Sequence, residues 1–157
     1  MNGCGRAVGN WSDAVRAAVV DASLALSWVF PGEEPSSAAV RLLHAFRSNQ
    51  IRLLAPSLWP YEVGNALRSG VIRGRISEAE GREAFTDLLG LGLSLVGFAP
   101  LTDLAWDLAW RHGITVYDAA YVAVAQAHNS PCYSLDKGLI EACAGSGLVQ
   151  SASDFTL

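Results

Sequence analysis

Short hydrophobic runs alternate along the chain with longer stretches in which hydrophobic residues recur at helical spacing. The short runs predict strands at residues 17–21, 51–54, 93–98 and 131–135, with an edge strand at 148–150. The periodic stretches predict helices at residues 24–29, 37–48, 58–71, 77–89, 102–112 and 117–128, and a short last helix that ends at 144. This alternation is typical of α/β architecture. We therefore predict a single three-layer α/β/α domain around a central, mostly parallel sheet of four to five strands.

Polar residues mark several of the predicted helix starts. Ser36 and Ser37 are candidate caps for the second helix, and Ser77 and Glu80 have the S-x-x-E spacing of a capping box. Thr102 is expected to cap the helix that follows it.

Composition narrows the class of protein. The chain has 157 residues, 51% of them hydrophobic and 17% charged, which suits one folded domain with a substantial core. No hydrophobic run reaches the ~18–20 residues that span a bilayer. The chain begins without the hydrophobic segment of a secretory signal. We interpret residues 1–16 as a flexible leader and residues 17–157 as the folded domain.

Charge and cysteine content add two expectations. The formal charge of −4 argues against broad electrostatic capture of nucleic acid, although a nuclease whose metal ions supply local positive charge remains compatible with it. Cys4, Cys132 and Cys143 lack the spacing of a metal site, and the last two lie among hydrophobic residues. Packed thiols of this kind fit a reducing, cytoplasmic location.

Four carboxylates interrupt segments that otherwise have the pattern of buried core: Asp21, Glu62, Asp118 and Asp136. A charged carboxylate in such surroundings is costly unless it is paired or binds a cation. Asp21 and Asp136 end predicted strands, while Glu62 and Asp118 lie in the first turns of helices. Since ligands of an open α/β sheet bind beyond the carboxyl ends of its strands, we expect the four acids to converge there.

Simpler explanations exist for some of these residues. Asp118 could serve only as a favourable acid at a helix N-terminus, and Asp136 only as a turn residue. Asp103 could join the site from its own helix start. Ser23 and Ser134, each two residues from an acid, could bond a substrate phosphate or a metal-bound water, or could be ordinary turn hydroxyls.

Clustered carboxylates raise one another's pKa values, and a hard divalent cation removes that penalty. All-oxygen ligation favours Mg²⁺ or Mn²⁺ over zinc. Such a cation can activate water for attack on phosphorus. The four acids therefore predict a metal-dependent reaction on a phosphate ester.

The segments around the acids resemble the PIN domain, and more narrowly the toxin ribonucleases of VapC-type toxin–antitoxin pairs. The resemblance covers residues 17–150 and rests on Val19-Val20-Asp21-Ala22-Ser23, Glu62-Val63-Gly64-Asn65-Ala66-Leu67, Tyr117-Asp118-Ala119-Ala120-Tyr121 and Ser134-Leu135-Asp136. The family usually has Thr-Ala-Asp in place of the last of these segments.

This resemblance implies an Mg²⁺- or Mn²⁺-dependent endoribonuclease that is homodimeric and is inhibited by a small cognate antitoxin. It assigns the catalytic and metal-binding roles to Asp21, Glu62, Asp118 and Asp136. It makes Asn65 and Ser134 supporting polar residues, and Ser23, two residues from Asp21, is a third candidate for this role.

Two further groups of residues suggest surfaces for partners. The arginines on and after the Glu62 helix could contact RNA, contact an acidic antitoxin tail or form an ordinary solvated face: Arg68, Arg73, Arg75 and Arg82. Trp106 and Trp110, one helical turn apart, could belong to a dimer interface or an antitoxin groove.

Three other functions compete with the ribonuclease. A phosphatase of the haloacid-dehalogenase type needs a second acid at position 23, where this chain has Ser23. A receiver-like phospho-accepting module needs an acidic pair upstream of its acceptor, but the neighbours of Asp21 are Val20 and Ala22. A catalytically inactive PIN scaffold is disfavoured by the intact set of four acids.

Overall fold

The computed structural model describes residues 16–157 and has a parallel sheet at its centre. The strands lie in the order β3-β2-β1-β4-β5, and every pair of neighbours is parallel. They are Arg16–Val20 (β1), Ile51–Pro56 (β2), Ser94–Val96 (β3), Cys132–Ser134 (β4) and Val149–Ser151 (β5). The predicted α/β class with a central parallel sheet is confirmed.

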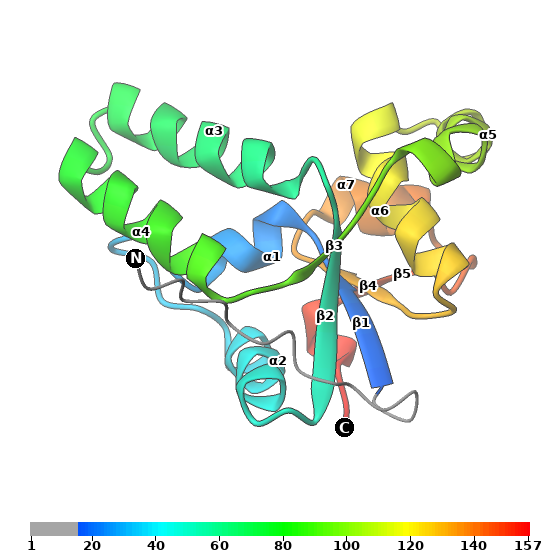
Figure 1. The fold of residues 1–157 in the computed structure, drawn as a ribbon, viewed down its shortest axis with the longest axis horizontal. Coiled ribbons are helices and arrows are strands. Elements are labelled where there is room, and N and C mark those ends of the chain that lie inside the picture. Colours follow the sequence, from blue (N-terminus) through cyan, green and yellow to red (C-terminus); the bar gives the residue numbers. More distant parts are fainter. Residues whose placement is uncertain (1–15) are drawn as a thin grey trace, which may run out of the picture.

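Helices cover the sheet and extend beyond its carboxyl edge (Figure 1). They are Ala22–Ser27 (α1), Ser37–Arg47 (α2), Trp59–Ile72 (α3), Glu78–Gly90 (α4), Thr102–His112 (α5), Val116–Ala127 (α6) and Lys137–Ala142 (α7), with 3₁₀ turns at Ala99–Leu101 (η1) and Ala152–Asp154 (η2). The α3–α4 hairpin lies on one side of the molecule, and α5 and α6 lie on the other. None of the helices within residues 16–157 has the length and hydrophobicity needed to cross a bilayer.

The central strands of the sheet are buried in the core. Val19 and Val20 of β1 are fully buried, as are Ile51 and Leu53 of β2. Helix α6 packs against β1, β2 and β4, and its residues 119–125 are all buried. A helix that is hydrophobic on all sides belongs in the interior. Polar groups at the start of α6 therefore lie next to the core.

Three details of the predicted elements need correction. Arg16, which we placed in the leader, opens β1; residues 1–15 of that predicted leader lie outside the described part of the chain. Strand β3 is shorter than predicted. Thr102 does not cap α5, because η1 leads directly into this helix and the Thr102 hydroxyl donates back to the carbonyls of Phe98 and Ala99.

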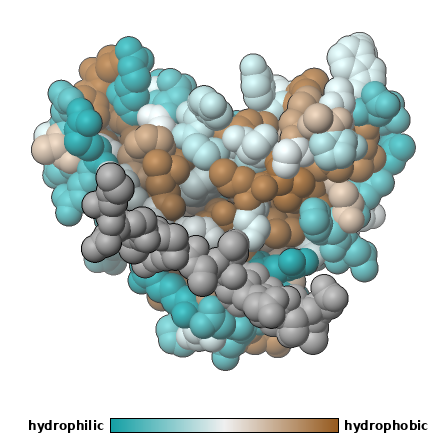
Figure 2. Space-filling view, in the orientation of Figure 1, coloured by the Kyte–Doolittle hydropathy of each residue, from teal (hydrophilic) through white to brown (hydrophobic). Residues whose placement is uncertain are grey.

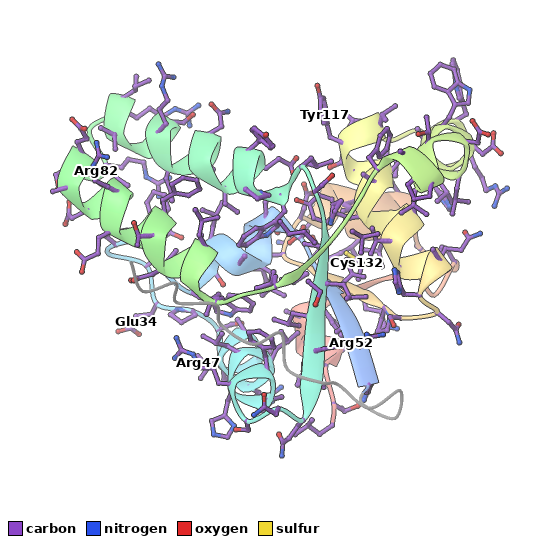
Figure 3. All side chains as sticks on the ribbon, viewed as in Figure 1. Glu34, Arg47, Arg52, Arg82, Tyr117 and Cys132 are labelled. Atoms are coloured by element: carbon purple, nitrogen blue, oxygen red, sulfur yellow. The ribbon has the colours of Figure 1, made fainter. Side chains whose placement is uncertain are left out.

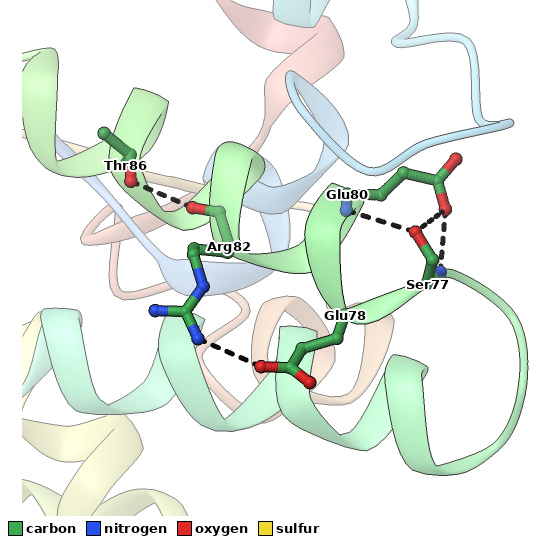
Figure 4. Close-up of polar contacts among 5 residues, drawn as sticks. All are labelled: Ser77, Glu78, Glu80, Arg82 and Thr86. Carbon is green, nitrogen blue, oxygen red and sulfur yellow. Dashed lines mark hydrogen bonds and ion pairs between the residues drawn. The ribbon is translucent and has the colours of Figure 1, made fainter.

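The capping box at the start of α4 is confirmed (Figure 4). The Ser77 Oγ accepts from the amide of Glu80 at 3.2 Å, and the Glu80 carboxylate accepts from the amide of Ser77 at 2.7 Å. Both bonds satisfy amides that the first turn of a helix leaves without partners. The S-x-x-E spacing thus fixed the beginning of this helix.

Candidate catalytic site

Asp21 stands where the buried strand β1 gives way to α1. It caps that helix, and its Oδ1 accepts from the amide of Leu24 at 2.9 Å. The residue is only 5% exposed. The carboxylate of Asp21 is therefore buried at the carboxyl edge of the sheet, next to the end of the central strand β1.

Two serines from different segments converge on Asp21. The Ser23 hydroxyl donates to its Oδ1 at 2.8 Å, and the Ser134 hydroxyl donates to its Oδ2. Strands β1 and β4 are neighbours, and Val20 lies opposite Tyr133. The residues that follow them, Asp21 and Ser134, therefore lie side by side at the sheet's edge. Both predicted supporting serines are thus in contact with a predicted catalytic acid.

Asp136 is joined to Asp21 through Ser134. The amide of Asp136 donates to the Ser134 Oγ at 2.9 Å. The Asp136 carboxylate is exposed and caps α7 by accepting from the amide of Leu139 at 3.1 Å. Asp136 therefore has the local structural role considered above, and its Oδ1 is the atom that fills it.

Glu62 and Asp118 approach the same edge from two helices. Glu62 lies in the first turn of α3, and its Oε2 accepts a hydrogen bond from the Tyr121 hydroxyl on α6. Asp118 lies in the first turn of α6, where the Thr115 hydroxyl donates to its Oδ2 at 2.7 Å and accepts from its amide at 3.0 Å. The helix N-terminus also favours the charge of Asp118.

The pKa values of Asp21 and Glu62 depend on burial, on hydrogen bonds and on the charges of the other acids. Burial raises the pKa of Asp21; hydrogen bonds from Ser134, Leu24 and Ser23 oppose that rise, and the charge of Asp136 adds to it. Burial also raises the pKa of Glu62, against the hydrogen bond from Tyr121 and together with the charges of Asp118 and Asp21. The charge interactions therefore run from Asp136 to Asp21, and from Asp21 and Asp118 to Glu62.

Burial, followed by the contact with Glu62, raises the pKa of Tyr121 far above its ordinary value. Its hydroxyl therefore keeps its proton, and it is the donor in this pair.

The chemistry of this donor set suits a hard divalent cation. Within residues 16–157, none of the four acids forms an ion pair with a basic side chain. Their ligating atoms are all carboxylate oxygens, which Mg²⁺ and Mn²⁺ prefer. However, no three side chains of His, Cys, Asp or Glu in the described part stand close enough together to hold one ion as they are. Binding therefore requires the carboxylates to turn toward a shared position.

Other predicted residues have different outcomes. Asn65 is exposed on α3, and its side chain makes no hydrogen bond to another described residue. Asp103 is exposed at the start of α5 and likewise contacts none of the four acids within residues 16–157. Sequence reasoning missed Thr115, although its T-x-x-D spacing with Asp118 is a capping pattern that could have indicated it. It also gave Tyr121 no role.

The arginines of the α3–α4 hairpin are partly engaged. The Arg75 guanidinium contacts Glu33 at 2.5 Å and lies 4.7 Å from the centre of the Phe30 ring. Arg82, at the outer end of α4 in Figure 3, pairs with Glu78 at 3.0 Å. A groove between α3 and α4 is mostly hydrophobic, and its charged lining residues are Arg68, Arg82 and Glu78.

Hydrophobic side chains also reach the surface. They gather in the middle of the face shown in Figure 2, between the α3–α4 hairpin and α5–α6. On α5, Trp106 and Trp110 are exposed and pack edge to face, with ring centres 6.0 Å apart. Tyr117, at the start of α6, is also exposed (Figure 3). Trp59, at the start of α3, is buried and belongs to the core.

Comparisons with known proteins agree with this architecture. The family model described as PIN domain matches residues 18–145. Ribonuclease VapC3 from Pyrobaculum aerophilum is 36% identical over 125 residues, which cover 78% of this chain and 92% of the relative. The crystal structure of PAE2754 from the same organism has a TM-score of 0.63 at 25% identity, covering 86% of this chain and 83% of that one. FitAcB from Neisseria gonorrhoeae shares the fold alone, with a TM-score of 0.59 at 14% identity over 88% of this chain and 99% of that one.

Proposed function

Because the chain belongs to the PIN domain family, among its VapC-type members, we propose that it is an Mg²⁺- or Mn²⁺-dependent endoribonuclease, the toxin of a toxin–antitoxin pair. The observation that carries this proposal is the buried Asp21 at the carboxyl end of β1, which accepts hydrogen bonds from Ser23 and Ser134 and has no basic partner within residues 16–157. The name of the relative VapC3, a ribonuclease, supports RNA as the substrate.

Each acid has a role in this proposal. Asp21, Asp118 and Asp136 hold the cation, and Glu62 completes the site or orients the attacking water. When bound, a divalent cation supplies positive charge that activates water and neutralises the charge developing on the phosphate. Ser23 and Ser134 donate to the two oxygens of Asp21 and so fix the direction of its carboxylate.

The partners of this enzyme are part of the same proposal. The hydrophobic groove between α3 and α4 suits an acidic segment of a cognate antitoxin, because Arg68 adds a positive charge beside the pair of Arg82 and Glu78. The exposed pair Trp106 and Trp110 suits burial between two copies of the chain in a homodimer. We place the protein in the cytoplasm, where the free thiols Cys132 and Cys143 would stay reduced.

Replacing Asp118 tests the proposed chemistry most directly. Asp118→Asn keeps an oxygen that can accept from Thr115 but removes the negative charge, so RNA cleavage with Mg²⁺ or Mn²⁺ should fall by about 10²–10³-fold. The measurement is cleavage of a labelled RNA by purified, antitoxin-free protein, and chelation of the metal should abolish it.

Glu83→Gln is the matched control, because Glu83 is an exposed acid on α4, outside the site. It should cleave RNA as the unmodified chain does. The proposal is wrong if the unmodified protein cuts no RNA with either metal, or if Asp118→Asn cuts as well as Glu83→Gln.

A further inference from the structure

Tyr121 extends from the core to a carboxylate of the site. Its side chain is only 2% exposed, within the buried stretch of α6, yet its hydroxyl donates to Glu62 Oε2 on α3. A phenylalanine would fill the same space in the core. The hydroxyl therefore adds nothing to hydrophobic packing, and its one hydrogen-bond partner within residues 16–157 is the acid.

This bond connects two helices that have few other connections. Within the described part of the chain, it is the only side-chain hydrogen bond between α3 and α6. Helix α3 packs mainly against α4 and α1, on the other side of the molecule from α6 (Figure 1). Glu62 is only half-buried and has several rotatable bonds, so without this donor its carboxylate is free to turn toward water.

The position of Tyr121 on α6 adds a second observation. It follows Asp118 by three residues, and side chains at this spacing lie on the same face of a helix. The same face of α6 thus supplies one acid of the site and the donor that fixes another. We propose that Tyr121 is a positioning residue that holds the Glu62 carboxylate at the sheet's edge, where Glu62 completes the cation site; this inference rests on the proposed function.

A second buried tyrosine offers a matched comparison. Tyr133 is 1% exposed, packs edge to face on Phe155 with ring centres 5.5 Å apart, and its hydroxyl interacts with Arg16 rather than with an acid of the site. Tyr133→Phe therefore removes the same atom from a similarly buried ring. It separates the loss of a buried hydroxyl from the loss of the contact with Glu62.

The test compares Tyr121→Phe with Tyr133→Phe in the full chain. Tyr121→Phe should bind Mn²⁺ about 10–100-fold more weakly in a calorimetric titration and lower kcat by a similar factor, because loss of an outer contact to a ligating carboxylate has effects of this size. The KM for RNA should stay unchanged. Tyr133→Phe should leave Mn²⁺ affinity and kcat within about twofold of the unmodified chain, whatever its melting temperature.

A double-mutant cycle shows whether Tyr121 acts through Glu62. In a Glu62→Ala background, the further change Tyr121→Phe should have no effect on Mn²⁺ affinity, since the group that it positions is gone. An equal loss in both backgrounds overturns the inference. So does a Tyr121→Phe variant that binds Mn²⁺ and cuts RNA like the unmodified chain. If the unmodified chain neither binds Mn²⁺ nor cuts RNA, the proposed function fails, and the role of Tyr121 fails with it.

Discussion

Serine hydroxyls hold carboxylates at two places in this molecule, with opposite results. At the start of α4, the amide and the hydroxyl of Ser77 each donate to the Glu80 carboxylate at 2.7 Å. These two bonds, the amide's first, lower the pKa of an acid that water surrounds. At the sheet's edge, Ser23 and Ser134 donate to Asp21, yet its pKa is raised because burial outweighs the hydrogen bonds.

The difference shows that hydrogen bonds alone do not offset the cost of burying a charged carboxylate. A second acid of α4, Glu78, also has a cationic partner, since it pairs with Arg82 (Figure 4). The site acids have none within residues 16–157. The charge of Asp136 adds to the raised pKa of Asp21, and the charges of Asp118 and Asp21 add to that of Glu62. Folding thus keeps negative charge at the sheet's edge at a cost to stability, which a bound cation would remove.

Asp21→Asn should produce the largest effect at the site. Cleavage should fall by about 10²–10³-fold, because the cation that would neutralise the charge developing on the phosphate loses a charged ligand. Stability should change in the opposite direction at neutral pH. The folded-state pKa of Asp21 is raised above 3.8, so the folded chain gains stability from protonation at low pH and loses it as pH rises through the raised pKa. The asparagine variant avoids that loss.

The melting temperature of Asp21→Asn in metal-free buffer should therefore exceed that of the unmodified chain at about pH 7.5, and the gap should shrink toward about pH 4. Glu80→Gln is the opposite case. The folded-state pKa of Glu80 is lowered, so its charge stabilises the fold above the unfolded value of 4.5, and that contribution is lost as pH falls. If Asp21→Asn and Glu80→Gln shift the melting temperature in the same direction at neutral pH, the comparison between the two regions fails.

Ser134→Ala and Ser77→Ala should have smaller effects than Asp21→Asn, the first on RNA cleavage and the second on stability. Each change removes a hydroxyl that donates to a carboxylate and accepts from a backbone amide. Ser134→Ala should lower RNA cleavage by about 10–100-fold, since it leaves Ser23 as the one side-chain donor to Asp21 within residues 16–157. Ser77→Ala should lower the free energy of unfolding by about 1 kcal/mol through the lost cap and leave cleavage unchanged. Equal cleavage by the two variants would remove Ser134 from the site.

The sequence predicted the frame of the site better than its contacts. Buried strands and capped helices gave the parallel sheet and the placement of Asp21 and Asp136 at strand ends, because these features depend on local pattern. The bond between Tyr121 and Glu62 joins residues 59 positions apart, and no local pattern encodes it. Thr102 failed as a cap for a similar reason, since the preceding turn η1 redirected its hydroxyl.

The coupling among the acids also had to come from the structure. The sequence shows that Asp21 and Asp136 both lie in hydrophobic segments. It does not show that Asp21 is deeply buried while Asp136 is exposed. Asn65 has the spacing of a residue one turn after Glu62, yet its side chain lies in solvent. Spacing along a helix fixes the face of a residue, and the depth of that face depends on what packs against it.

Arg82→Ala should have the smallest effect. Arg82 and Glu78 are 77% and 79% exposed, and an exposed pair at this helical spacing contributes less than about 0.5 kcal/mol. The melting temperature and the KM for RNA should therefore match those of Arg47→Ala, a control at the end of α2 (Figure 3). The measurement is RNA affinity against salt concentration. A flatter salt dependence for Arg82→Ala alone would mean that this arginine neutralises a phosphate, and that the α4 face belongs to the RNA-binding surface rather than contrasting with the site.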